Sequence, residues 1–159
     1  MPILDKLLDR TQIQKALLQD RVVRVLFTTT KKIVLHGGTV VWRCYGGERF
    51  SKDLDIYVSK ELEVMKTLNR LSQAGIAWSL IQKRKTGFGL YYNYVVTSGG
   101  VDIALQITMK KAEGSLSRYG TVDGSYVNIS ALPADRLLLE KAEALLDRAK
   151  ARDLYDMNS

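Results

Sequence analysis

Apolar residues recur along this chain at two spacings, one typical of helices and one typical of strands. Apolar positions that return every three or four residues predict helices at about 4–28, 39–45, 60–74 and from Pro133 onward, with a short helical segment around 152–157. Continuous or alternating apolar runs predict strands at 33–35, 54–58, 76–86, 89–97, 101–108 and 126–129. The polar stretch from Lys110 to Gly124 is expected to be a loop.

These predicted elements imply an α+β fold. Helices stand first and last along the chain with strands between them, so we expect a small mixed β-sheet flanked by helices. The 159 residues contain no repeat, linker or low-complexity tract, and this length suits one hydrophobic core. We therefore expect a single domain spanning 1–159.

Composition limits where the protein works. No apolar run is long enough to span a bilayer, and the N-terminus lacks the layout of a signal peptide. Cys44 is the only cysteine, which excludes an intramolecular disulfide. With a single histidine as well, a structural zinc site is not expected. Together these features predict a cytoplasmic protein.

The charge balance indicates the kind of binding partner. The chain has 24 Lys and Arg against 17 Asp and Glu, a formal net charge of +7. This surplus favours a polyanion such as RNA or a nucleoside triphosphate, although a basic protein from a basic proteome would show the same balance. The cationic residues expected to border an RNA path are Lys83, Arg84, Lys85, Lys110, Lys111 and Arg118.

Two carboxylates carry the clearest chemical signal. Asp53 and Asp55 are separated by one residue of a predicted strand, so their side chains project from the same face, about 7 Å apart along the strand. Like charges this close destabilise each other unless a cation lies between them. Oxygen-only ligands suit Mg²⁺ or Mn²⁺. The pair therefore predicts a metal site.

A glycine pair precedes this strand. Gly37 and Gly38 lie where a predicted strand leads into a helix that begins near Thr39, a geometry that favours an anionic phosphate. Taken alone, the pair would indicate only a tight turn. Arg43 and Arg49 flank the next glycine pair, and either could hold a triphosphate.

Further candidates lie elsewhere in the chain. Asp102 is a charge within an apolar strand, which indicates either a third metal ligand or a surface position on an edge strand. Lys141 could neutralise triphosphate charge, or be an exposed lysine on a solvated helix face. Ser51 is expected to cap or orient the carboxylate strand. His36 could contact a phosphate or pack within the fold.

Three tyrosines follow the strand period. Tyr91, Tyr92 and Tyr94 lie in one predicted strand, so their side chains divide between its two faces. One face could stack on nucleic-acid bases, and packing against a helix is the alternative use.

Four segments taken together resemble a known family. They are Gly37-Gly38-Thr39, the run from Arg49 to Asp55 (Arg-Phe-Ser-Lys-Asp-Leu-Asp), Lys141, and the run 150–156 (Lys-Ala-Arg-Asp-Leu-Tyr-Asp). The set resembles the AbiEii/MenT group of nucleotidyltransferase toxins, within the DNA polymerase β-like nucleotidyltransferase superfamily. The segments follow the family order and span most of the chain.

The resemblance implies a polymerase β-like nucleotidyltransferase fold and assigns roles to the candidates. Asp53 and Asp55 would bind metal, with Asp102 as the superfamily's third carboxylate. Gly37, Gly38, Thr39, Arg49 and Ser51 would contact the nucleotide phosphates. Lys141 would touch the nucleotide, and Asp153 would belong to the last motif and orient Lys141.

The expected activity is transfer of a nucleoside monophosphate from an NTP to an acceptor hydroxyl, dependent on Mg²⁺ or Mn²⁺. The expected acceptor is an RNA 3′ end, such as that of a tRNA, or a protein hydroxyl, and the enzyme would be the toxin of a toxin–antitoxin pair with an antitoxin partner. Two alternatives remain. One is a nucleotidyltransferase acting on a small molecule such as an antibiotic, and the other is a non-catalytic nucleotide- or RNA-binding module.

The chain differs from the family in length. Family members usually carry a further helical region after the final motif, and this chain ends at Ser159. Three readings follow: a minimal enzyme, a homodimer that completes its site, or a protein that has lost activity.

Overall fold

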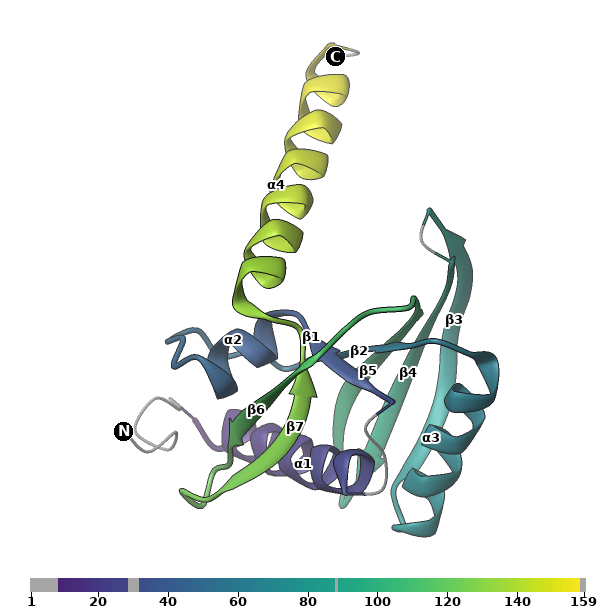
Figure 1. Ribbon diagram of the computed structural model, residues 1–159, viewed down its shortest axis with the longest axis vertical. Coiled ribbons are helices and arrows are strands. Elements are labelled where there is room, and N and C mark those ends of the chain that lie inside the picture. Colours follow the sequence, from purple (N-terminus) through teal and green to yellow (C-terminus); the bar gives the residue numbers. More distant parts are fainter. Residues whose placement is uncertain (1–8, 29–31, 88, 158–159) are drawn as a thin grey trace.

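The structure, a computed structural model, describes the backbone of residues 9–28, 32–87 and 89–157, with side chains up to Lys150. Its elements, in chain order, are α1 (Arg10–Phe27), β1 (Val34–His36), α2 (Gly38–Cys44), β2 (Leu54–Val58), α3 (Glu61–Gln73), β3 (Ala77–Thr86), β4 (Gly89–Ser98), β5 (Val101–Met109), β6 (Ser115–Gly120), β7 (Tyr126–Ala131) and α4 (Ala134–Met157). Figure 1 shows how these helices and strands are arranged. The start of the helix predicted at 4–28 lies outside the described residues.

The strands form one seven-stranded sheet in the order β3-β4-β5-β2-β1-β7-β6. β2 pairs with β5 in parallel, as β1 does with β7, and the other neighbours are antiparallel. The sheet is therefore mixed and flanked by helices, which confirms the predicted α+β class. None of the described helices is long and apolar enough to cross a membrane.

The apolar core lies on the sheet face that α1 and α3 cover. Strand alternation turns Leu54 and Ile56 of β2, with Leu105 of β5, into this layer, where they are almost fully buried. Val22 of α1 and Leu71 of α3 meet them there. The alternate residues of the same strands, Asp55 among them, consequently stand on the opposite face.

Two sequence predictions are wrong. The stretch 110–124, expected to be a loop, contains β6, an edge strand paired with β7. The sequence did not indicate this strand because its apolar residues do not all face the core. Tyr119 is buried, but Leu116 is 78% exposed. The short helical segment expected around 152–157 is the end of the continuous helix α4 rather than a separate element.

A buried ion pair fastens α2 to the rest of the fold. Arg43 lies 2.8 Å from Asp20 of α1, and the two side chains are 0% and 6% exposed. The guanidinium also donates to Gln19 and to the carbonyls of Ala16 and Gly120. Arg43 is therefore enclosed within the protein and unavailable to a triphosphate, which leaves Arg49 as the arginine candidate beside this turn.

Removing the Arg43 charge should destabilise the fold strongly. Arg43→Met keeps an apolar stem but leaves Asp20 buried without its partner, which costs about 3–5 kcal/mol. Arg24→Met is the matched control, because the Arg24–Asp123 pair is exposed, with side chains 46% and 64% accessible, and should cost about 1 kcal/mol or less. Denaturant unfolding measures both. Equal losses in the two variants would contradict the structural role of Arg43.

Candidate active site

The β1–α2 turn lies directly against the carboxylate strand. Gly37 has φ +82° and ψ −169°, a backbone region open essentially to glycine alone. A Cβ at Gly37 would come within 3.0 Å of Asp55 Oδ2, and one at Gly38 would lie 3.3 Å from Ser51 Oγ. The glycine pair is therefore required here because no side chain fits between this turn and Asp55.

Thr39 and Ser51 fasten the same turn from within. The Thr39 side chain is fully buried, and its hydroxyl lies 2.9 Å from Ser51 Oγ and hydrogen bonds to the carbonyl of Asp53. Gln19 of α1 donates to the carbonyl of Ser51 at 2.8 Å. These contacts place Thr39 and Ser51 as supports for the backbone that carries Asp53.

The surroundings of Asp55 disfavour its ionised form. Burial raises its pKa to about 6, the nearby charges of Asp53 and Glu140 act in the same direction, and His36 opposes them. Asp53 lies two residues earlier, just before β2, so the two carboxylates share one end of this strand. A cation placed between them would relieve both the burial and the repulsion.

A polar cluster beside Asp55 joins α4 to the sheet. Glu140 of α4 lies 3.3 Å from His36 Nδ1 and accepts a hydrogen bond from the Tyr57 hydroxyl. The His36 and Tyr57 rings stack at 3.6 Å. Burial would raise the pKa of Glu140, but the hydrogen bonds from His36 and Tyr57 hold it below its ordinary value. The sequence analysis missed Glu140, and its place next to Lys141 was the available signal.

A cavity of about 420 Å³ opens next to this cluster. The segment after β5 and the first turns of α4 form its walls, which include Lys110, Lys111, Arg136, Glu140 and Glu143. Lys110 Nζ also lies 5.2 Å above the centre of the Tyr57 ring. Lys110 and Lys111 therefore border the polar cluster.

The structure does not bring Asp102 to Asp53 and Asp55. β2 and β5 pair so that Asp55 stands opposite Gln106, four residues after Asp102. Asp102 is on the same sheet face but about 13 Å further along β5. There it is exposed and accepts a hydrogen bond of 2.8 Å from Thr97. Among the described residues, no group of three or more His, Cys, Asp or Glu side chains could hold a metal.

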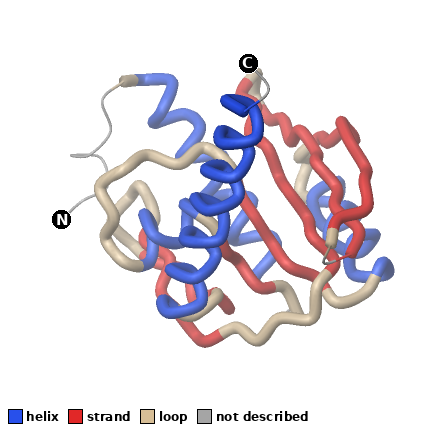
Figure 2. The backbone as a smooth tube through the Cα atoms, turned by 90° about the horizontal axis from the view of Figure 1, so that it is seen from above, coloured by secondary structure: helices blue, strands red, loops and turns tan. Residues whose placement is uncertain are grey.

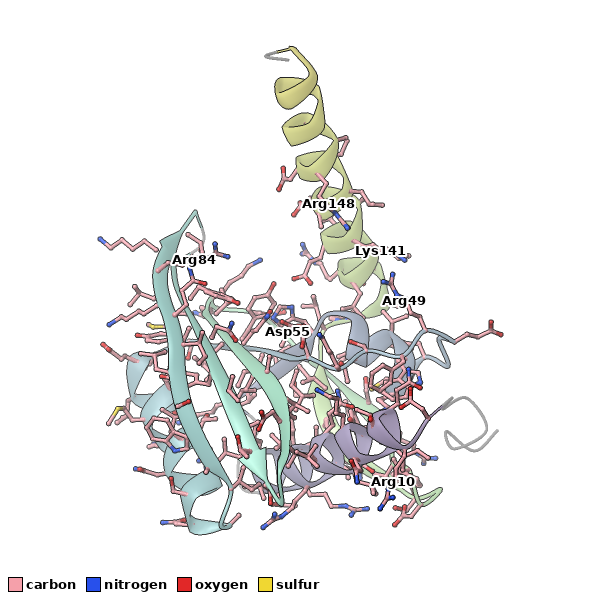
Figure 3. All side chains as sticks on the ribbon, turned by 180° about the vertical axis from the view of Figure 1, so that it is seen from behind. Arg10, Arg49, Asp55, Arg84, Lys141 and Arg148 are labelled. Atoms are coloured by element: carbon pink, nitrogen blue, oxygen red, sulfur yellow. The ribbon has the colours of Figure 1, made fainter. Side chains whose placement is uncertain are left out.

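The remaining two candidates, Lys141 and Asp153, lie far apart along helix α4. Lys141 is exposed one residue after Glu140, close to the sheet. Asp153 follows twelve residues later in the same continuous helix, about 18 Å further along its axis, and its side chain lies outside the described residues. Figure 1 shows α4 rising away from the sheet, and in Figure 3 its far end lies well away from Asp55.

The site thus has an open shape. In Figure 3, Asp55 lies between the base of α4, near Lys141 and Arg49, and the β3–β4 hairpin that carries Arg84. Figure 2 shows the backbone seen from above, with helices, strands and loops distinguished by colour. Arg49 is exposed. The arrangement combines the half-buried Asp55 carboxylate, next to Asp53, with exposed cationic side chains. Such a combination suits a metal-bound polyphosphate.

Comparisons with known proteins bear on the family and the fold. A family model described as "Nucleotidyl transferase AbiEii toxin, Type IV TA system" matches residues 21–158. A crystal structure of a candidate nucleotidyltransferase from Helicobacter pylori is similar at 22% identity and TM-score 0.59, covering 84% of this chain and 59% of that one. JHP933 from Helicobacter pylori is similar at 22% identity and TM-score 0.54, covering 80% and 56%. No curated protein matches the chain.

These two structures share the fold with the present chain. The chain spans less than two thirds of the length of either.

Substituting Gly37 should disrupt the site more than positive φ alone explains. Gly37→Ala forces a methyl group against Asp55 Oδ2 in addition to an unfavourable backbone, and we expect a loss of roughly 3 kcal/mol or more. Gly46→Ala is the control, because Gly46 has φ +72° but nothing within 4 Å of its added Cβ, so about 1–2 kcal/mol should be lost. Thermal unfolding measures both, and a Gly37→Ala variant as stable as Gly46→Ala would refute the contact.

Proposed function

The chain belongs to the AbiEii family of nucleotidyltransferase toxins, and from this premise we propose that it transfers a nucleoside monophosphate from an NTP to an acceptor hydroxyl with the help of a divalent metal ion. The observation that carries the proposal is the Asp55 carboxylate, half-buried next to Asp53 and held against the Gly37 turn. Among the described residues no basic side chain hydrogen bonds to it, and a carboxylate of raised pKa in such a place is typical of a functional site.

The donor set suits Mg²⁺ or Mn²⁺. Mg²⁺ usually binds through one or two carboxylates together with substrate phosphates and water, so Asp53 and Asp55 are sufficient as protein ligands. When bound, the ion would polarise the phosphates and neutralise the charge of the leaving group. The proposal therefore does not require Asp102 or Asp153, which the resemblance also assigns to the site.

The protein's own part in the reaction is to position the substrates and to neutralise the charge of the phosphates. The acceptor oxygen bonds to the α-phosphorus, the bond from that phosphorus to the leaving pyrophosphate breaks, and the hydroxyl proton passes to water. Gly37 and Gly38 let the β1–α2 turn lie directly against Asp55 and Ser51, while Lys141 and Arg49 supply positive charge near the base of α4. Glu140 orients the start of α4 through His36 and Tyr57.

We propose RNA as the acceptor, with an antitoxin protein as a further partner of this toxin family. The net charge of +7 and the position of Lys110 and Lys111 at the cavity beside Glu140 support an RNA path. The second candidate is a binding module without catalysis, which the separation of Asp102 from Asp55 favours.

Asp55→Asn should separate activity from stability. Loss of the charged ligand should reduce transfer from labelled NTPs to total RNA below about 1% of the wild-type rate. The fold should gain about 2–3 kcal/mol at neutral pH, because a raised native pKa means that the buried charge destabilises the protein. This gain should be complete above pH 6 and should disappear as the pH falls below 3.8, where Asp55 is protonated in both states.

Asp102→Asn is the matched control for this variant, since it removes the exposed carboxylate on the same sheet face. The arrangement predicts near wild-type transfer for Asp102→Asn. Full transfer by Asp55→Asn would refute the proposed mechanism, and loss of transfer in both variants would favour the three-carboxylate site instead.

RNA affinity should depend steeply on salt. Each phosphate contact to a single strand contributes about 0.7 to the slope of log affinity against log salt. The double variant Lys110→Ala/Lys111→Ala should therefore bind a fluorescent RNA more weakly and with a slope lower by about one to one and a half. Anisotropy titrations between about 50 and 200 mM salt measure this. Binding that ignores salt would contradict the RNA assignment but leave nucleotidyl transfer intact.

A further inference from the structure

The sheet face that carries Asp55 continues across the sheet to the β3–β4 hairpin. Cross-strand pairing runs from Tyr57 on β2 to Thr108 on β5, then to Tyr91 on β4 and Arg84 on β3. Paired residues of neighbouring strands point to the same side of a sheet. Tyr91 and Arg84 therefore stand on the Asp55 face, away from the layer that α1 and α3 cover.

Arg84 and Tyr91 form a stacked pair at the open end of this face. The guanidinium carbon lies 4.7 Å from the centre of the Tyr91 ring, and the Arg84 side chain is exposed while Tyr91 is half-buried. In the described part of the chain, no carboxylate forms an ion pair with Arg84. The guanidinium thus lies over an aromatic ring, where its donors can bind another anion.

The three consecutive cations of β3 do not act together. The sequence predicted that Lys83, Arg84 and Lys85 would all border the carboxylates, but strand alternation divides them. Lys83 lies over Tyr92, 5.3 Å from the ring centre, and Tyr92 is buried on the α3 side, where its hydroxyl meets Glu61. Lys85 shares that side by alternation, so Arg84 is the one member that faces Asp55.

The position of the pair suits a neighbour of the reacting nucleotide. Tyr91 is separated from Asp55 by two strand spacings and two residues, which is about 12 Å between Cα atoms. On the β1 side of Asp55, His36 lies 3.3 Å from Glu140 and stacks on the Tyr57 ring, which closes that side of the face. The hairpin side is therefore the side on which a nucleotide chain can extend over the sheet.

From this geometry we propose that Arg84 and Tyr91 form a nucleotide subsite, in which a base stacks on the pair and its phosphate binds the guanidinium. The chemistry is general: bases stack on tyrosine rings and on guanidinium planes, and guanidinium binds phosphate through two parallel hydrogen bonds. The subsite rests on the proposed function. Its ligand is either the NTP or a nucleotide of the acceptor RNA, since both present a base joined to phosphate.

Binding measurements on variants of the full chain test the subsite. The probes are a short fluorescein-labelled oligoadenylate, followed by anisotropy, and each of the four common NTPs with Mg²⁺, followed by calorimetry. Arg84→Ala and Tyr91→Leu should each weaken one class of probe by about tenfold. If oligoadenylate is the ligand, Arg84→Ala should also lower the salt slope by about 0.7, whereas Tyr91→Leu should weaken binding without changing the slope.

Lys83→Ala and Lys85→Ala are matched controls, because they remove the same charge from the same strand on the opposite face. They should change affinity less than about twofold. Weaker oligoadenylate binding by the Arg84 and Tyr91 variants assigns the subsite to the acceptor, and weaker NTP binding assigns it to the NTP. Unchanged affinity for both probes, or equal losses in the lysine controls, would overturn the proposal.

Thermal unfolding of each variant verifies that it is folded, and Arg84→Gln provides a second exposed substitution should Tyr91→Leu fail to fold. The binding experiment needs no catalytic turnover. A loss of nucleotidyl transfer in Asp55→Asn and a loss of binding in Arg84→Ala are therefore independent results. The two experiments thus distinguish failure of the subsite from failure of the proposed function.

Discussion

The close approach of the β1–α2 turn to Asp55 is the constraint on which this structure depends. Gly37 must lack a side chain for Asp55 Oδ2 to occupy its place, and Gly38 must be small beside Ser51. Thr39 then hydrogen bonds to Ser51 and to the Asp53 carbonyl, so one turn sets the position of both carboxylates. The antiparallel pairing of His36 with Asp55 continues the same contact into the sheet.

Holding a charge in this position costs stability, and other contacts offset the cost. Burial raises the pKa of Asp55, which means that its ionised form opposes folding at neutral pH. The apolar layer between the sheet and the helices α1 and α3 supplies the main compensation. Arg43 and Asp20 lock α2 onto α1 and the β6–β7 hairpin, so the turn that meets Asp55 has a rigid support.

Strand alternation then divides the sheet into a structural face and a chemical face. Leu54, Ile56 and Leu105 face the core, whereas Asp55 and Gln106 face the other side. Glu140 closes this second face at the α4 end, and the β3–β4 hairpin leaves it open at the far end. One periodicity of two residues thus separates the groups that stabilise the protein from the groups that could bind a nucleotide.

The sequence by itself determined the local features. The strand at 54–58 has the predicted bounds, and the hairpin at 76–97 is within one residue of its observed ends. Tertiary structure decided what depends on register. Asp102 lies four residues from the Asp55 row because β5 is set against β2 at Gln106, and β6 exists because β7 offers it an edge. The periodicity of apolar residues predicts which face of a strand or helix a residue lies on. Strand register and helix contacts, such as that of Glu140 with Tyr57, bring together residues far apart in the chain. No local sequence pattern encodes which distant residues will meet.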